Sequence, residues 1–166
     1  MKRLLSGLLA LFLLIICFTS CAEQTFVTFY YVRPESAYQF GTTQAIIVGE
    51  QRDSASNIQD LRQLLILYLH GPLNENFQSP FPRGTSLVDI QQEGDHLTIR
   101  LSSIASAMKG TDLTLACACL SKTCFDATDA ERVTVIATGF GNISVTMTRD
   151  SLLLVDDSVP MPEEQY

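Results

Sequence analysis

A long apolar run near the start of the chain constrains its architecture most. Lys2 and Arg3 are followed by Leu4 to Phe18, which is almost wholly apolar. A short basic segment followed by about 15 apolar residues is typical of a secretory signal, and it is shorter than a comfortable membrane span. We therefore expect residues 1–20 to act as a targeting segment, and the folded domain to be built from the residues that follow.

The run ends in Phe18-Thr19-Ser20-Cys21, which resembles a bacterial lipobox. In that motif a signal peptidase cuts just before a cysteine that carries a diacylglyceryl group, and Ser20 supplies the small residue needed before the cut. Cys17 is a poorer acceptor because Ile16 precedes it. We predict that Cys21 is lipidated. Two alternatives stay open: a plain secretory signal that leaves Cys21 as an ordinary thiol, and an uncleaved anchor.

The charge balance excludes one class of partner. The chain has 18 acidic and 11 basic residues, and two of the basic ones lie in the leader, so residues 21–166 carry a net charge of −9. Nucleic acid requires a basic binding surface, and a charged patch for anionic lipid would also be basic. We therefore expect no nucleic acid partner. Membrane attachment would depend on the lipid at Cys21, because two or more acyl chains hold a protein stably on a bilayer.

The pattern of apolar residues after Cys21 predicts strands and two helices. Ser56 is expected to cap the first helix, which ends at Gly71-Pro72, and Thr111 to cap the second. Glu93-Gly94-Asp95 and Gly139–Asn142 are predicted turns. The predicted strands are residues 25–32, 44–50, 86–92, 96–102, 132–137, 143–148 and 152–155.

This order is β-β-α-β-β-α-β plus a terminal hairpin. It predicts an α+β fold, with a mostly antiparallel sheet and two helices packed on one face. The domain plan is a lipoprotein signal peptide at 1–20, a lipid anchor and short tether at 21–25, and a single domain at 26–155. Residues 156–166 form an acidic tail that we expect to be disordered.

The pattern resembles the GerMN domain of sporulation and spore-germination lipoproteins, over roughly residues 26–156. The stretches that carry the resemblance are the helix end Leu69–Pro72, the segment Pro82–Leu87, the strand Leu97–Ser102, the second helix with Val133–Ile136, and the segment Met147–Asp156.

The resemblance implies a non-catalytic module that serves envelope or spore assembly and germination through protein–protein contacts. It implies a location on the outer face of the bacterial cytoplasmic membrane, and envelope or sporulation proteins as partners, with peptidoglycan as a further candidate. No catalytic, cofactor or metal residues are implied. The alternatives are a lipoprotein that binds a cell-wall glycan or small ligand and, more remotely, a wall hydrolase.

Three cysteines in the second helix form the most conspicuous cluster. On a helix, Cys117 and Cys124 share a face, whereas Cys119 points about 200° away from Cys117. We expect Cys117 and Cys124 to be small core residues, a role that free cysteine often takes. A metal or redox role and a disulfide after local rearrangement are the alternatives, although a structural zinc site requires four ligands.

Few other residues suggest chemistry. His70 is expected at a helix end. His96 lies beside Asp95, so a hydrolytic Asp-His-Ser triad assembled in space is an alternative. No nucleophile-elbow motif supports it. The aromatic residues Phe26, Phe29, Tyr30 and Tyr31 are predicted to form a strand core, with a ligand surface as the alternative.

Overall fold

The computed structural model describes residues 26–34, 45–53 and 60–150. The predicted signal peptide, Cys21 and its tether, the cap at Ser56, the strand at 152–155 and the acidic tail lie outside these residues. The elements in chain order are β1 (Phe26–Val32), β2 (Ile47–Asp53), α2 (Leu61–Leu69), β3 (Leu87–Glu93), β4 (His96–Leu101), the 3₁₀ helix η2 (Ser103–Ala107), α3 (Gly110–Ala127), β5 (Arg132–Thr138) and β6 (Asn142–Thr148).

The strands form two sheets. β1 and β2 form an antiparallel pair, while the larger sheet has the order β3-β4-β5-β6. Its β3–β4 and β5–β6 pairs are antiparallel, and β4 and β5 run parallel because α3 carries the chain back between them. The α+β class and the mostly antiparallel pairing are therefore confirmed, but the strands divide between two sheets where the sequence pattern suggested one.

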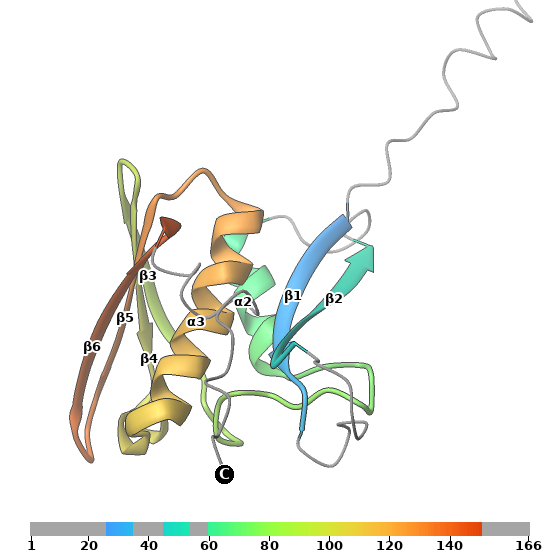
Figure 1. The fold of residues 1–166 in the computed structure, drawn as a ribbon. Coiled ribbons are helices and arrows are strands. Elements are labelled where there is room, and N and C mark those ends of the chain that lie inside the picture. Colours follow the sequence, from blue (N-terminus) through green and yellow to red (C-terminus); the bar gives the residue numbers. More distant parts are fainter. Residues whose placement is uncertain (1–25, 35–44, 54–59, 151–166) are drawn as a thin grey trace, which may run out of the picture.

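Both helices lie on one face of the larger sheet, as predicted, and the β1–β2 sheet covers their other side (Figure 1). The reason lies in α3, which is apolar around most of its circumference. Its consecutive residues Ala116 to Leu120 are all fully buried. A helix that is hydrophobic all round must be enclosed by neighbouring elements. One sheet can cover only half of α3, and β1–β2 supplies the second cover.

The edge of β1 is completed by side chains and a loop instead of another strand. The Tyr30 amide donates to Thr123 Oγ1 at 3.0 Å, and that hydroxyl donates to the Cys119 carbonyl at 3.0 Å. Further along, Val32 and Gln78 exchange two backbone hydrogen bonds of 3.0 and 2.8 Å. Because α3 occupies the position where another strand would pair, β1 cannot join the larger sheet.

The core lies between the helices and the two sheets. Leu97, Ile99 and Leu101 alternate on β4 and all point inward, with exposed fractions of 0, 0 and 3%. Parallel pairing places Leu97 beside Val133 and Ile99 beside Val135 on β5, whose side chains are equally buried. The alternation of apolar residues along β4 therefore indicates which face of the larger sheet is covered.

The helix starts differ from the predicted ones. α2 begins after Asp60, whose carboxylate accepts from the Gln63 amide at 2.7 Å, so Asp60 takes the capping role expected of Ser56. α3 begins at Gly110 after Lys109, which places Thr111 inside the first turn. Capping needs an extended residue just before the helix, which is Lys109, so the expected Thr111 lies two residues too late.

Arg149 closes the other end of α3. Its guanidinium donates to the carbonyls of Phe125, Thr128 and Ala130, each at 3.0 Å, and lies 5.1 Å from the centre of the Phe125 ring. The last carbonyls of a helix lack intrahelical partners and attract cations. The segment after β6 is thus fixed onto the helix end. In the described part of the chain, no helix is long and apolar enough to cross a bilayer.

Two neighbouring residues of α2 give a matched test of this packing. Leu65 is fully buried, whereas Ile66 is 41% exposed. Leu65→Asp should lower the free energy of unfolding by more than about 4 kcal/mol, because the charge has no partner in the core. Ile66→Asp introduces the same charge on the same helix and should change stability by less than about 1 kcal/mol. Chemical denaturation measures both, and equal effects would contradict this assignment of the helix faces.

Candidate functional site

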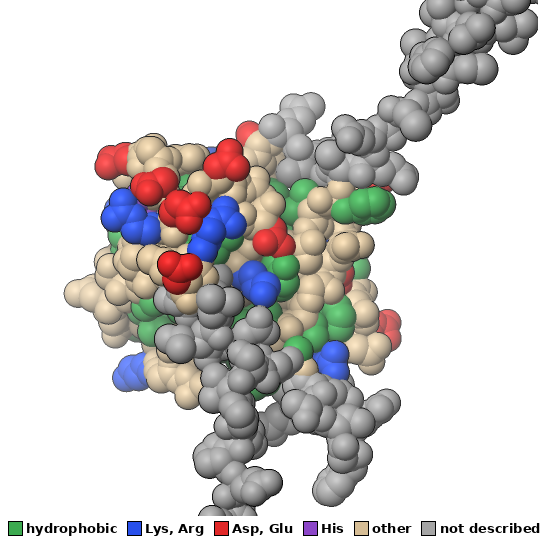
Figure 2. All heavy atoms as spheres, turned by 45° about the horizontal axis from the view of Figure 1, so that its top comes forward, with side chains coloured by type: hydrophobic (Ala, Val, Ile, Leu, Met, Phe, Trp, Pro, Cys, Tyr) green, Lys and Arg blue, Asp and Glu red, His purple; other side chains and the backbone are tan. Residues whose placement is uncertain are grey.

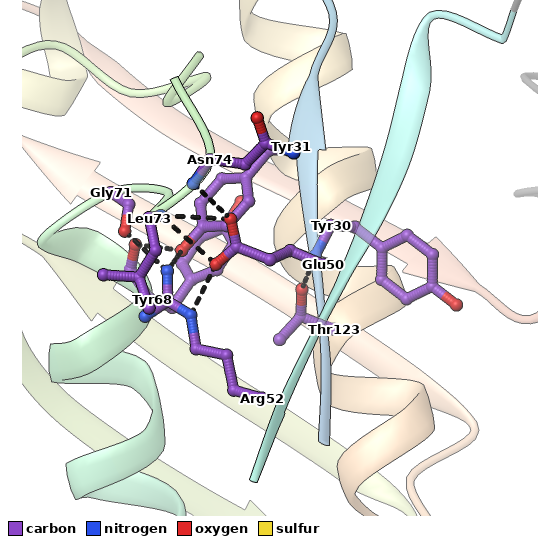
Figure 3. Close-up of polar contacts among 9 residues, drawn as sticks. All are labelled: Tyr30, Tyr31, Glu50, Arg52, Tyr68, Gly71, Leu73, Asn74 and Thr123. Carbon is purple, nitrogen blue, oxygen red and sulfur yellow. Dashed lines mark hydrogen bonds and ion pairs between the residues drawn. The ribbon is translucent and has the colours of Figure 1, made fainter. Parts of the chain in front are cut away.

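The most connected polar cluster joins β2 to the loop after α2 (Figure 3). The Glu50 carboxylate accepts from the backbone amides of Leu73 and Asn74 at 3.0 and 2.9 Å, and from Arg52 Nε at 2.6 Å. The Glu50 and Arg52 side chains are only 10 and 14% exposed. This carboxylate therefore fixes the backbone of a loop that the sequence alone leaves unspecified.

Arg52 extends the cluster into the core. Its Nη2 donates to the Gly71 carbonyl at 2.8 Å and to the Tyr31 hydroxyl at 3.2 Å, and its guanidinium lies 4.7 Å from the centre of the Phe29 ring. The Tyr31 hydroxyl in turn donates to the Tyr68 carbonyl at 3.2 Å, and the two tyrosine rings stack 5.1 Å apart. Because each charge is met by hydrogen bonds within the chain, we interpret this cluster as structural.

The aromatic residues of β1 follow the alternation of the strand. Phe29 and Tyr31 are fully buried, which confirms their predicted core role. Phe26 is 56% exposed, so the predicted core role is wrong for this residue. It is the first residue of β1, at the end of the strand. Tyr30 lies on the opposite face from Phe29, with Lys122 Nζ 4.9 Å from the centre of its ring.

The Glu50 contacts have a consequence for pH. Burial alone would raise the pKa of the carboxyl, but the amides of Asn74 and Leu73 together with the Arg52 guanidinium lower it below its usual value. A carboxyl whose pKa is lowered by folding stabilises the fold fully above its unfolded-state pKa. That contribution is lost as the pH falls through the lower, folded-state pKa.

We predict that Glu50→Gln lowers the free energy of unfolding at pH 7 by about 2–4 kcal/mol, because Arg52 is left buried without its carboxylate. The difference between the variant and the parent chain should shrink as the pH falls through the lowered pKa of Glu50, where the parent loses the same charge. Urea denaturation at several pH values measures this. Glu75→Gln, at an exposed position of the neighbouring loop, is the control, and a pH-independent difference would count against the ionic role.

The three helix cysteines are enclosed on both sides of α3. Cys117 and Cys124 are fully buried, as predicted, and so is Cys119, because the β1–β2 sheet covers the side to which it points. All three thiols are free, so the disulfide alternative is not observed. Burial raises the pKa of Cys117 and Cys119 to about 12, and that of Cys124 further. Among the described residues, no three His, Cys, Asp or Glu side chains gather as metal ligands.

These thiols should be inert in the folded chain, because only the thiolate reacts. We expect a maleimide to leave Cys117, Cys119 and Cys124 unmodified at pH 7, and to label all three in denaturant. Peptide mass spectrometry of the labelled chain distinguishes the sites.

Cys117→Ala should lower the free energy of unfolding by about 1–3 kcal/mol through the cavity that it creates. Rapid labelling of the folded chain, or loss of a bound metal on Cys117→Ala, would contradict a packing role.

The two histidines lie in separate environments. The His96 ring is within 2.8 Å of Thr134 Oγ1, which is 2.8 Å from Thr146 Oγ1 on the next strand. Asp95 instead pairs with Arg132 at 3.2 Å. His70 follows the last residue of α2 and is exposed. The structure therefore joins neither His96 to Asp95 nor the two histidines into a catalytic group.

A feature that the sequence did not reveal is the exposed tip of the β5–β6 turn. Phe140 is 81% exposed, yet its backbone is held firmly. Its amide donates to Ser106 Oγ at 2.9 Å, and the Ser106 hydroxyl donates to the Ser103 carbonyl at 2.6 Å. At Gly139, with φ of +154°, an added Cβ would lie 2.5 Å from Ser103 Cβ, so only glycine allows this approach. The sequence signal that could have indicated this exposed turn is an aromatic residue between two glycines, Gly139-Phe140-Gly141.

A pocket of about 800 Å³ lies beside Ala107, the last residue of η2. Its walls come from the end of β1, the start of β2, the 78–82 loop and the start of α3. Val32, Ile46, Phe81, Met108 and Leu115 contribute apolar surface, and Lys109 and Asp112 are among its polar lining residues.

Comparison with known proteins places this fold in a family. Residues 28–139 match the Germane family, described as sporulation and spore germination. The chain belongs to this family. No curated protein matches it. One solved structure, titled "Putative Lipoprotein from Clostridium perfringens", is similar with 16% identity and a TM-score of 0.39, covering 76% of this chain and 88% of that one.

Proposed function

We propose that this Germane-family chain is a lipid-anchored extracytoplasmic module that acts in sporulation or germination through protein–protein contacts, without catalysis. Family membership over residues 28–139 supports the biological setting. The basic and apolar leader that ends in Ser20-Cys21 supports the lipid anchor. The full use of Glu50 and Arg52 in structural hydrogen bonds supports a binding rather than a catalytic role.

The observation that carries the proposal is the position of the two ends of the domain. β1 begins at one end, and Phe26 follows Cys21 by only five positions. The β5–β6 turn with Phe140 lies at the opposite end, beside the start of α3 (Figure 1). α3 has 18 residues and spans about 27 Å. An anchor at Cys21 would hold the first end near the bilayer and present the other to the envelope space.

The surface of the anchored end fits this orientation. Figure 2 shows acidic and basic side chains gathered together there. Next to the starts of β4 and β5 and the end of β6, Arg132 pairs with Asp95 at 3.2 Å and Arg149 with Glu131 at 3.4 Å. Each such pair has no net charge, so it adds neither attraction nor repulsion at an anionic membrane. The exposed Phe140 lies away from this end, where a protein partner would reach it.

A second candidate is glycan binding on the face of the larger sheet that lies opposite the helices and that no described element covers. The strand register aligns Gln91, Thr98, Thr134 and Thr146 in a row across all four strands. The Gln91 amide and the Thr98 hydroxyl in this row could hydrogen-bond to a polysaccharide, whereas the buried Thr134 hydroxyl already contacts His96 and Thr146. Retention of the protein on purified cell-wall glycan, abolished by Thr98→Val with Thr146→Val, would favour this candidate over the assembly module.

The anchor is tested at the predicted lipidation site. Cys21→Ala should remove fatty-acyl label in cells fed an alkyne fatty acid, and should leave an unprocessed precursor or released protein. Cys17→Ala is the matched control, because it removes the neighbouring leader cysteine and should retain label and membrane attachment. Acyl label that persists in the Cys21→Ala chain would overturn the assignment.

A further inference from the structure

The outer edges of the two sheets are not protected equally. An edge strand exposes unpaired backbone amides and carbonyls, and soluble proteins usually protect such an edge with charges, bulges or a neighbouring element. The outer edge of β1 is met by Thr123 and by Gln78, as described above. Among the described strands, β2, β3 and β6 also lie at the end of a sheet. These three edges can therefore be compared for what would prevent another strand from pairing with them.

β2 and β3 both carry features that oppose pairing. The side chains of Glu50 and Arg52 on β2 point inward and are paired, and inward-pointing charges are a common protection of sheet edges. β3 has a bulge near its start and carries the acidic residues Asp89 and Glu93. Arg62 of α2 also lies 3.6 Å from Asp89, so the helix contacts this strand. Neither edge offers a regular, uncharged template.

β6 has none of these features. Its seven residues, Asn142–Thr148, include no charge, proline or glycine, and they pair with β5 in a regular register without a bulge. Ile143 and Met147 are buried on the side of the sheet that α3 contacts. Ser144 and Thr146 are exposed on the opposite face. Figure 1 shows β6 at the margin of the larger sheet, and no described strand pairs with its second edge.

The sequence of β6 is self-complementary in antiparallel pairing. Polar and apolar residues alternate along it, and this pattern reads the same in both directions from Val145. When two copies pair about Val145, Ile143 of one copy lies opposite Met147 of the other. Ser144 then lies opposite Thr146. Apolar residues meet on the helix side and hydroxyl groups meet on the other face, and cross-strand pairs of both kinds stabilise antiparallel sheets.

Charge favours a second copy at β6 and disfavours one at β3. The same pairing of β3 about Gln91 would place Asp89 opposite Glu93 twice, and like charges directly opposite one another destabilise a sheet. The chain has 18 acidic residues against 11 basic ones, so two copies repel each other at a distance. A contact made by an uncharged strand adds no local repulsion to this. A second copy of the chain is therefore the occupant that β6 fits.

We propose that the outer edge of β6 is a self-association site, at which two copies join their larger sheets into one continuous sheet. The two-fold axis of an antiparallel strand pair is perpendicular to the sheet, so the helices of both copies lie on the same face. The two β1–β2 sheets then lie on one side of the pair, which is compatible with attachment of both copies to one membrane. The association itself needs no lipid. One strand edge is a small contact, so the dimer is reversible.

A charge-exchange experiment tests the proposal by sedimentation equilibrium of the full chain in a density-matched detergent. The parent chain should form reversible dimers. Ser144→Lys combined with Thr146→Lys places lysines opposite one another across the axis and should weaken the dimer by roughly tenfold or more. These lysines also reduce the net negative charge of the chain, so weaker association must come from the local contact.

The matched control is Ser144→Lys combined with Thr146→Glu. It changes the same two exposed positions and leaves the net charge as it is, but it places each lysine opposite a glutamate of the other copy. This variant should associate at least as tightly as the parent chain, and circular dichroism checks that both variants fold. A monomeric parent chain, or equal association of the two double variants, would overturn the proposal.

Disulfide trapping locates the contact and its register. In a chain with Cys17→Ala and Cys21→Ala, one tagged copy carries Ser144→Cys and a differently tagged copy carries Thr146→Cys. Mild oxidation should join these copies, because opposed residues have Cβ atoms about 4.5–5.5 Å apart and the helix thiols are buried. Gln91→Cys in both copies, at the exposed centre of β3, is the control. Equal joining through position 91, or none through positions 144 and 146, would contradict pairing of β6 strands.

Hydrogen exchange shows whether another part of the same chain covers the edge instead. The amides of β6 that point away from β5 should exchange quickly at concentrations where the chain is monomeric, and slowly where it is dimeric. Protection of these amides that does not depend on concentration would show that the edge is already occupied within one copy, and it would overturn the proposal.

Discussion

The rest of the structure depends on the enclosure of the middle of α3, where residues 116–121 are all fully buried. A helix that carries apolar residues on all sides cannot lie on a surface, so a second layer must cover what the larger sheet leaves open. β1 and β2 provide that layer, and Thr123 satisfies the amide of Tyr30 at the edge of β1. The Thr123 hydroxyl accepts the hydrogen bond that a carbonyl of a neighbouring strand would otherwise accept, and the small sheet ends at two strands.

The sequence predicted the elements better than their arrangement. Leu97, Ile99 and Leu101 alternate within one strand, so their burial can be read from a local pattern. The division into two sheets could not be read in this way, because it depends on which surface of α3 each strand meets. Cys119 shows the difference: its angular position on the helix was predicted correctly, but what lies on that side of α3 is a property of the whole fold.

The same limit applies to the surface proposed for binding. A turn at Gly139–Asn142 was predicted from its glycines, yet the exposure of Phe140 depends on the distant Ser106, which holds the turn in place. Glu50 is similar, since its partners Leu73 and Asn74 are backbone amides far along the chain. Side chains that bind backbone groups far away in the sequence leave no local pattern, and such contacts hold the loop after α2 and the β5–β6 turn.

The three cysteines of α3 set a condition on how the chain reaches its folded state. Before α3 is enclosed, Cys117, Cys119 and Cys124 are accessible thiols, and outside the cytoplasm accessible thiols are readily oxidised. Once buried, they are shielded from oxidants. In the extracytoplasmic location that we propose, burial must therefore outpace oxidation. A substitution that slows the closing of the two sheets over α3 would then divert molecules into covalently trapped, misfolded forms.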